Sequence, residues 1–272
     1  MGNEFDSTAV GTFEDCLGYP KTSGGIRHRS KISDAASLGY AATKARVRET
    51  LENFGVGTIG LYSLHSAFGF SRDAASRKKV VGSWRALVEL RDAGVLTALG
   101  VSNFNARDLR AFAADPDLGG VAMPDALQNK YDVYRRGDQR DDGSSEDVLV
   151  AAADLGVAVV AYSTLSGWPF GFGALGDPLL AQIAATRKTS VATLVHRWAL
   201  DRGAAIIPRS SSPANVRENL GAPPALAALT PAERAAIDAL PHLVAHGGNA
   251  ARTRNALRPS ARRRGGGDTA DL

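Results

Sequence analysis

A short apolar run that recurs along this chain, and ends each time in polar residues, restricts its fold more than any other feature. One copy, Leu96–Phe104 (LTALGVSNF), ends in Ser102 and Asn103 and has helical patterns on both sides. Apolar runs of this length are typical of strands buried on both faces. The carboxyl ends of parallel strands are where α/β folds bind ligands, but from this copy alone a cap on the next helix is the favoured interpretation.

Three further copies extend this pattern to a sheet: Ile59–His65, Val157–Ser163 and Ala204–Arg209. Strands that alternate with helices over short links predict a parallel sheet with right-handed crossovers. With weaker runs included, the expected strands are 26–32, 59–65, 96–101, 125–129, 157–162 and 204–208. The expected helices are 3–18, 41–54, 80–93, 106–114, 146–155, 178–186, 190–201, 213–220 and 231–240.

Three longer segments are expected to lie outside this alternation: Phe68–Lys79 as a loop over the rim, Tyr131–Ser145 as a charged connector, and Leu165–Asp177 as a loop rich in glycine and aromatic residues. Six strands leave the topology open. A closed (β/α)8 barrel needs eight strands and about 250 residues, whereas an open, doubly wound sheet accepts six.

Composition limits the partners. The chain has 272 residues, 44% of them hydrophobic, and a net charge of +4 to which arginines near the C-terminus contribute strongly. We expect 241–272 to be a disordered, solvated basic tail rather than a nucleic-acid site. The sequence has no apolar run of about 18 residues and no signal-peptide pattern, so we expect a cytoplasmic protein without a membrane partner. The single Cys16 excludes a disulfide framework and a cysteine metal cluster, and no metal site is expected.

The strand-end motifs together carry a family resemblance. Leu61–Ser66 (LYSLHS) is similar to DLYLIHxP, Gly100–Phe104 is GVSNF, and Ala161–Leu165 (AYSTL) is similar to AYSPLG. In this order and at these spacings, over roughly residues 25–235, they resemble the aldo-keto reductases, which are TIM-type (β/α)8 barrels that bind NADPH. The resemblance implies transfer of a hydride from NADPH to the carbonyl of a small aldehyde or ketone.

The resemblance also assigns the cofactor site. It implies that the nicotinamide carboxamide is held by Ser102, Asn103 and Gln128, and that Tyr162 stacks on the nicotinamide ring, with Ser163 and Leu165 following it. For Tyr162, an ordinary core position is the alternative. The motif IPKS…EN, which binds the adenosine 2′-phosphate, matches Arg209, Ser210, Ser211, Glu218 and Asn219. An arginine suits phosphate, but Asn215 stands where the family often has a second arginine, which weakens a strict preference for NADPH over NADH.

The catalytic residues are matched only in part. His65 falls on the histidine that polarises the substrate carbonyl, and Lys31 matches the lysine of TTKI, which lowers the pKa of the catalytic tyrosine. Taken singly, His65 is more often a satisfied core residue, and Lys31 is one charge in a basic run. Met1 stands at the position of the general-acid tyrosine. We therefore expect a partial barrel over 1–240 that lacks the first two strands and the helix between them.

Three hypotheses follow from this. The first is an NADPH-dependent carbonyl reductase that is impaired because the tyrosine and its partner aspartate are absent. Loss of a general acid usually lowers the rate by about 10²–10⁴-fold. The second is a non-catalytic protein that binds NADPH and regulates another, and the third is a truncated gene product. Neither a particular substrate nor an oligomeric state follows from the sequence.

Overall fold

The computed structural model describes residues 28–118, 121–137, 146–165 and 173–240, and in these ranges strands and helices alternate as expected. The strands are β1 (Arg29–Ile32), β2 (Ile59–Leu64), β3 (Leu96–Ser102), β4 (Ala126–Asp132), β5 (Arg135–Arg136), β6 (Ala158–Tyr162) and β7 (Ala205–Ile206). The α-helices are α2 (Tyr40–Phe54), α3 (Ala74–Asp92), α4 (Ala106–Ala113), α5 (Val148–Asp154), α6 (Pro178–Thr186), α7 (Val191–Asp201), α8 (Pro213–Ala225) and α9 (Pro231–Asp238). Single 3-10 turns lie at Ala35–Ser37, Pro116–Leu118 and Ala174–Gly176.

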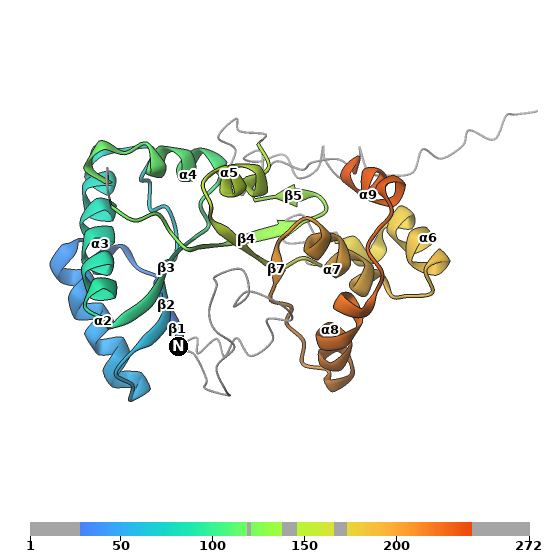
Figure 1. Cartoon of the computed structure of the whole chain (residues 1–272), viewed down its shortest axis with the longest axis horizontal. Helices are drawn as coiled ribbons and strands as arrows, with labels where there is room; N and C mark the ends of the chain where they lie inside the picture. The colour runs from blue at the N-terminus through green and yellow to red at the C-terminus, as the bar shows by residue number, and fades with distance from the viewer. Residues whose placement is uncertain (1–27, 119–120, 138–145, 166–172, 241–272) are drawn as a thin grey trace, which may run out of the picture.

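The strands form one seven-stranded sheet in the order β1-β2-β3-β4-β6-β7, with every neighbour in this path parallel. Strand β5 is not part of this order and pairs antiparallel with β4. Figure 1 shows α2 and α3 beside the first strands and α6 to α9 gathered beyond β7, with β4 running between the two groups. In the described part of the chain, the path ends at β7 without returning to β1, so the sheet is open and incomplete as a barrel.

The two faces of the sheet carry different side chains because residues alternate along each strand. The large core lies on the helix side and includes Tyr62 and Leu64 of β2. A smaller apolar layer on the other face is built from Leu61, Ala98, Ala126, Val160 and Ala205. Tyr62 lies within 3.0 Å of the Thr50 hydroxyl of α2, and it therefore faces the helices, whereas the His65 end of the same strand belongs to the rim.

Close packing on the inner face requires a glycine at position 100. A Cβ there would lie 2.4 Å from the Ser63 hydroxyl and 3.2 Å from the Ala126 carbonyl oxygen. Ser63 and Gly100 are Cα partners in the β2–β3 register. The glycine that opens the GVSNF motif therefore has a packing role, which is to let two neighbouring strands place a hydroxyl between them.

Two of the expected segments were wrong. Helix α3 begins at Ala74 rather than at Val80, because Asp73 caps it by accepting from the Ser76 amide at 2.7 Å. Of the segment Phe68–Lys79, which was expected to be a loop, only the part up to Asp73 lies outside the helix. Similarly, Tyr131–Ser145 is not all connector, since β4 extends to Asp132 and turns into β5.

Other expected boundaries shifted by a few residues. The last strand is shorter than expected, and α8 continues to Ala225 through Pro223 and Pro224. The helix expected at 3–18, the tail 241–272 and the aromatic residues Trp168, Phe170 and Phe172 lie outside the described residues.

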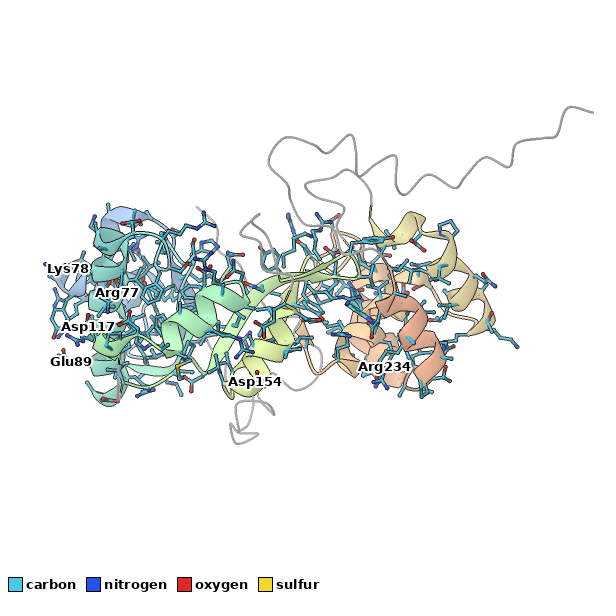
Figure 2. All side chains as sticks on the ribbon, turned by 90° about the horizontal axis from the view of Figure 1, so that it is seen from above. Arg77, Lys78, Glu89, Asp117, Asp154 and Arg234 are labelled. Atoms are coloured by element: carbon cyan, nitrogen blue, oxygen red, sulfur yellow. The ribbon has the colours of Figure 1, made fainter. Side chains whose placement is uncertain are left out.

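Charged side chains cover the outer helices. Arg77 of α3 forms a two-bond ion pair with Asp115, with both distances 2.6 Å, and a third bond to Asp117 at 2.7 Å. Figure 2 shows Arg77, Asp117 and Glu89 together on the outer side of this end of the molecule. In the described ranges, no helix is both long and apolar enough to cross a membrane.

Candidate functional site

The end of β3 is shaped by Asn103, which adopts a left-handed conformation with φ of 58°. Asparagine tolerates this conformation better than most residues with a Cβ. The Asn103 amide and the Ser102 hydroxyl both donate to the Gln128 carbonyl oxygen, at 3.1 and 2.7 Å. The cap of α4 is Asn105, whose side chain accepts from the Asp108 amide. The helix-cap interpretation of Ser102 and Asn103 was therefore wrong.

The Asn103 side chain joins three strand ends. Its Nδ2 donates to the backbone carbonyl of His65, after β2, at 2.8 Å. Its Oδ1 accepts from the Tyr162 hydroxyl, at the end of β6, at 2.7 Å. One amide thus holds the ends of β2, β3 and β6 in a common cluster.

Lys31 reaches the same cluster from β1. Its ammonium donates to Oε1 of Gln128, which lies on β4. Because an ammonium has donors and no acceptor, this bond fixes the orientation of the Gln128 amide and leaves Nε2 to serve as a donor. That is the group needed to bind a carboxamide oxygen.

His65 follows β2 directly and has an exposed side chain. Its amide donates to the Ile32 carbonyl oxygen at 3.0 Å, which fixes its backbone against β1. We refer to Lys31, His65, Ser102, Asn103, Gln128 and Tyr162 as the strand-end cluster. Five of them lie at or just after the carboxyl ends of β1, β2, β3 and β6, and Gln128 lies within β4 as the register partner of Ser102.

Ser163 and Leu165 continue from β6. Ser163 is exposed and left-handed, with φ of 55°, and Leu165 is half-buried. Beside them lies Lys130, which was missed because it fell at the boundary of the expected connector. Its position two residues after Gln128 in the same strand was the available signal, since such residues share one face.

Arg209, Ser210 and Ser211 lie between β7 and α8, with Arg209 and Ser211 exposed. Ser210 Oγ accepts from the Ser212 amide at 3.1 Å, and Ser212 caps α8. The N-terminus of a helix with a neighbouring arginine favours anions. The structure therefore brings these predicted phosphate residues together.

Glu218 and Asn219 lie on α8, but Glu218 is turned toward α7. Its carboxylate accepts from the hydroxyls of Ser190 and Thr193, the latter at 2.8 Å, and these bonds lower its pKa. Asn219 is buried. The part of the predicted adenosine site on α8 is thus tied to the neighbouring helix.

His196 of α7 is fully buried, and neither ring nitrogen has a hydrogen-bond partner among the described residues. Burial lowers its pKa to about 4, partly offset by the nearby carboxylate of Glu218. The imidazole is therefore neutral at pH 7 and serves as packing.

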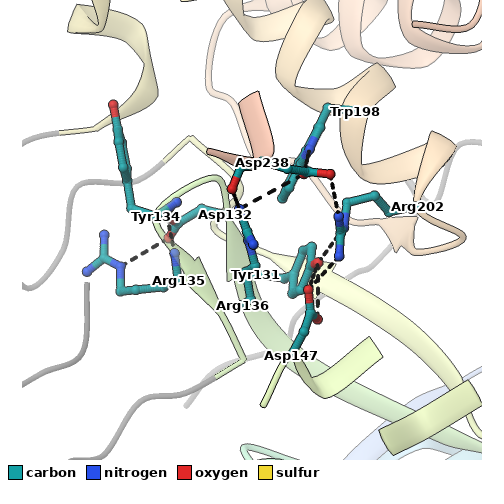
Figure 3. A network of polar contacts seen from close by, with 9 residues as sticks. All are labelled: Tyr131, Asp132, Tyr134, Arg135, Arg136, Asp147, Trp198, Arg202 and Asp238. Carbon is teal, nitrogen blue, oxygen red and sulfur yellow. Dashed lines mark hydrogen bonds and ion pairs between the residues drawn. The ribbon is translucent and has the colours of Figure 1, made fainter. Parts of the chain in front are cut away.

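A polar network around Arg202 holds the C-terminal helices to the sheet (Figure 3). Its guanidinium donates to the Tyr131 hydroxyl at 2.8 Å, to Asp238 of α9 at 2.9 Å and to Asp147 at 2.5 Å. The Tyr131 ring stacks on Trp198 with ring centres 5.4 Å apart. Desolvation by burial and the neighbouring Asp147 carboxylate raise the pKa of Tyr131 well above its usual range.

Comparison with known proteins identifies what this arrangement is similar to. The family model described as "Aldo/keto reductase family" matches residues 30–241. An aldo-keto reductase of Mycolicibacterium vanbaalenii is 29% identical over 184 residues, which cover 67% of this chain and 58% of that protein. An NADPH-dependent codeinone reductase of Papaver somniferum is 26% identical over 239 residues, covering 79% and 70%.

Solved structures agree on the fold. A Bombyx mori aldo-keto reductase in complex with NADP superposes with a TM-score of 0.62 at 22% identity, covering 78% of this chain and 67% of that one. An aldo-keto reductase from a Medee basin deep-sea metagenome gives 0.64 at 21%, covering 79% and 71%. The fold expected from the resemblance is thus confirmed. The chain spans 58% of the length of the first curated relative.

Proposed function

This chain belongs to the aldo/keto reductase family, and from that premise we propose that it binds NADPH and reduces the carbonyl of a small aldehyde or ketone. The observation that carries the proposal is the strand-end cluster, in which Asn103 joins His65 and Tyr162 while Lys31 orients Gln128. The Bombyx mori relative was crystallised with NADP, which supports the choice of cofactor class.

The residues present fit a nicotinamide dinucleotide at both ends. Asn103 and Gln128 offer amide groups matched to a carboxamide, and the half-buried Tyr162 offers an aromatic ring. Ser102 is buried and supports them by donating to the Gln128 carbonyl oxygen. Ser163 and Leu165 follow Tyr162 in the chain, and we propose that they contact the cofactor beside it. At the other end, Arg209 and the serines before α8 suit a phosphate. When bound, NADPH supplies the hydride.

The chain's own residues would handle the carbonyl. In this proposal, His65 donates a hydrogen bond to the carbonyl oxygen and so polarises it, while Lys31 keeps the Gln128 amide in its binding orientation. A reducing compartment such as the cytoplasm suits a chain with one cysteine.

A tyrosine proton donor beside His65 is the missing part among the described residues. Tyr62 faces Thr50 on the helix side, Tyr40 donates to Glu89 on the surface, and Tyr131 and Tyr134 bond Asp147 and Asp177. The hydroxyl of Tyr162, the tyrosine of the strand-end cluster, is committed to Oδ1 of Asn103 at 2.7 Å, and in this proposal its ring stacks on the cofactor. We therefore propose that this polypeptide turns over slowly, by about 10²–10⁴-fold relative to a site that has the donor.

Two measurements on the full chain test this function. NADPH titration, followed by the change in its fluorescence, is expected to saturate, and reduction of a generic aldehyde is expected to be slow but above the protein-free rate. Saturable binding without turnover would instead favour the non-catalytic, NADPH-binding alternative, which the positions of the described tyrosines already favour over efficient catalysis. Absence of binding would reject both.

A further inference from the structure

We propose that Lys130 is a positioning residue of the cofactor site, whose buried ammonium holds the turn after β6 in the conformation that presents the Tyr162 ring. The inference rests on the proposed function and adds to it a residue that the family motifs do not name. Lys130 does not itself contact the reacting atoms in this proposal. It acts on Ser163, the residue that follows Tyr162.

The register brings the two strands together at this point. Lys130 of β4 and Tyr162 of β6 are Cα partners in a parallel pair. The Lys130 side chain is 1% exposed, and its Nζ donates to the Ser163 carbonyl oxygen at 3.3 Å. A charge buried to this degree persists only where paired groups compensate its lost hydration.

Asp132 supplies that compensation and fixes the ammonium in place. Its carboxylate is 3.1 Å from the Lys130 Nζ and is 2% exposed. The same carboxylate accepts from the amides of Tyr134 and Arg135, at 2.9 and 3.1 Å, and from the Arg135 Nε at 3.2 Å. Because the β4–β5 hairpin holds Asp132 from three sides, Asp132 can hold Lys130.

Ser163 is the residue that needs support. Its φ of 55° is in the left-handed region, which is unfavourable for a residue with a Cβ. A hydrogen bond from Lys130 to its carbonyl oxygen stabilises the turn that this residue makes. The Tyr162 ring is then held at two ends, by Asn103 at its hydroxyl and by Lys130 through the following peptide.

A double-mutant cycle tests this arrangement, because glycine adopts the left-handed conformation without the Cβ penalty. Lys130→Met is expected to raise the Kd for NADPH about tenfold in the natural background, as is typical for a lost charged hydrogen bond. In the Ser163→Gly background, the same change is expected to raise it less than about threefold. Lys79→Met, on the exposed surface of α3, is the matched control.

Hydrogen exchange of the peptide 158–165 gives a readout that does not depend on the cofactor. It is expected to be faster in Lys130→Met than in the natural chain, with a smaller difference in the Ser163→Gly background. An equal effect of Lys130→Met in both backgrounds, on Kd or on exchange, would overturn the inference. If the natural chain fails to bind NADPH, the proposed function falls and the exchange comparison alone decides. If the methionine variant does not fold, Lys130→Gln, whose amide is shorter and uncharged, takes its place in the cycle and is again expected to raise the Kd for NADPH more in the natural background than in the Ser163→Gly background; equal effects would overturn the inference.

Discussion

The Tyr162 hydroxyl donates to Oδ1 of Asn103 at 2.7 Å, and this bond joins two strands that are not neighbours in the sheet. Strand β4 lies between β3 and β6, so the bond crosses the strand that carries Gln128. The same asparagine holds the His65 carbonyl at 2.8 Å. Asn103 thus fixes the spacing of the strand ends at which we place the nicotinamide.

Tyr162→Phe keeps the ring but removes this bond. We expect a loss of about 1 kcal/mol in the free energy of unfolding, typical of one hydrogen bond, and a rise in the Kd for NADPH of less than about fivefold. Tyr162→Ala removes the ring as well and is expected to raise the Kd for NADPH by more than about tenfold. Urea unfolding and NADPH titration measure the two effects. Tyr40→Phe, which removes an exposed hydroxyl bonded to Glu89, is the control; if it weakened NADPH binding as strongly, the assignment of Tyr162 would fail.

Arg209→Met tests the phosphate end of the site. Arg209 is exposed, so the free energy of unfolding is expected to change by less than about 0.5 kcal/mol. The Kd for NADPH is expected to rise about tenfold or more, because a charged contact to a phosphate is lost, while the Kd for NADH changes little. Parallel titrations with both nucleotides decide the point. An equal loss for NADH and NADPH would remove Arg209 from the 2′-phosphate site.

His196→Leu is expected to stabilise the protein. The buried imidazole has two unpartnered nitrogens among the described residues, and an apolar residue of similar size removes that cost. Its pKa of about 4 lies below the usual 6.5, so the unfolded chain binds the proton more readily than the folded one. Above pH 6.5 the imidazole is neutral in both states, and its titration does not affect the free energy of unfolding. As the pH falls from 6.5 toward 4, the unfolded chain takes up the proton first, and the free energy of unfolding decreases by on the order of 3 kcal/mol.

The check is the slope of unfolding free energy between pH 6.5 and 5, a window chosen to lie above the usual titration of carboxylates. The natural chain is expected to lose stability on acidification in this window, and His196→Leu to flatten the curve. Parallel curves for the two proteins would show that the imidazole is hydrated or partnered in solution.

Arg202→Met is expected to destabilise the protein by about 3 kcal/mol, because it removes the closest cation from two carboxylates in a partly buried network and leaves only Arg136, 4.0 Å from one of them. These are Asp147, which caps α5, and Asp238 of α9. Arg234→Met, on the outer surface of α9 (Figure 2), is the control and is expected to change stability by less than about 0.5 kcal/mol. Urea unfolding measures both. Equal midpoints would mean that the network of Figure 3 contributes no net stability.

His65, Asn103 and Tyr162 could be predicted from the sequence because each ends or follows a short apolar strand, whereas Lys31 and Gln128 were assigned from the family resemblance. Alternation alone placed Tyr62 on the face opposite His65, and its bond to Thr50 on α2 agrees. Local signals of this kind do not depend on the rest of the molecule, and they gave β2, β3 and β6 within one or two residues.

The hairpin of β4 and β5 could not be predicted in the same way. Its charged residues Lys130, Asp132 and Arg135 are the kind that normally lie on the surface, yet all three are buried and compensate one another. Burial of this kind is a tertiary effect that composition argues against. The start of α3 was missed for a different reason, since Asp73 was a cap signal that the apolar pattern from Val80 onward concealed.

The left-handed backbone at Asn103 limits which residues can replace the asparagine at this position. Glycine would accept the dihedral angles but would lose both the donor to His65 and the acceptor for Tyr162. Aspartate would keep the acceptor while turning a carboxylate against the His65 carbonyl, and serine is too short to span both contacts. None of these three replacements meets both demands, the conformational one and the chemical one, that the junction places on this position.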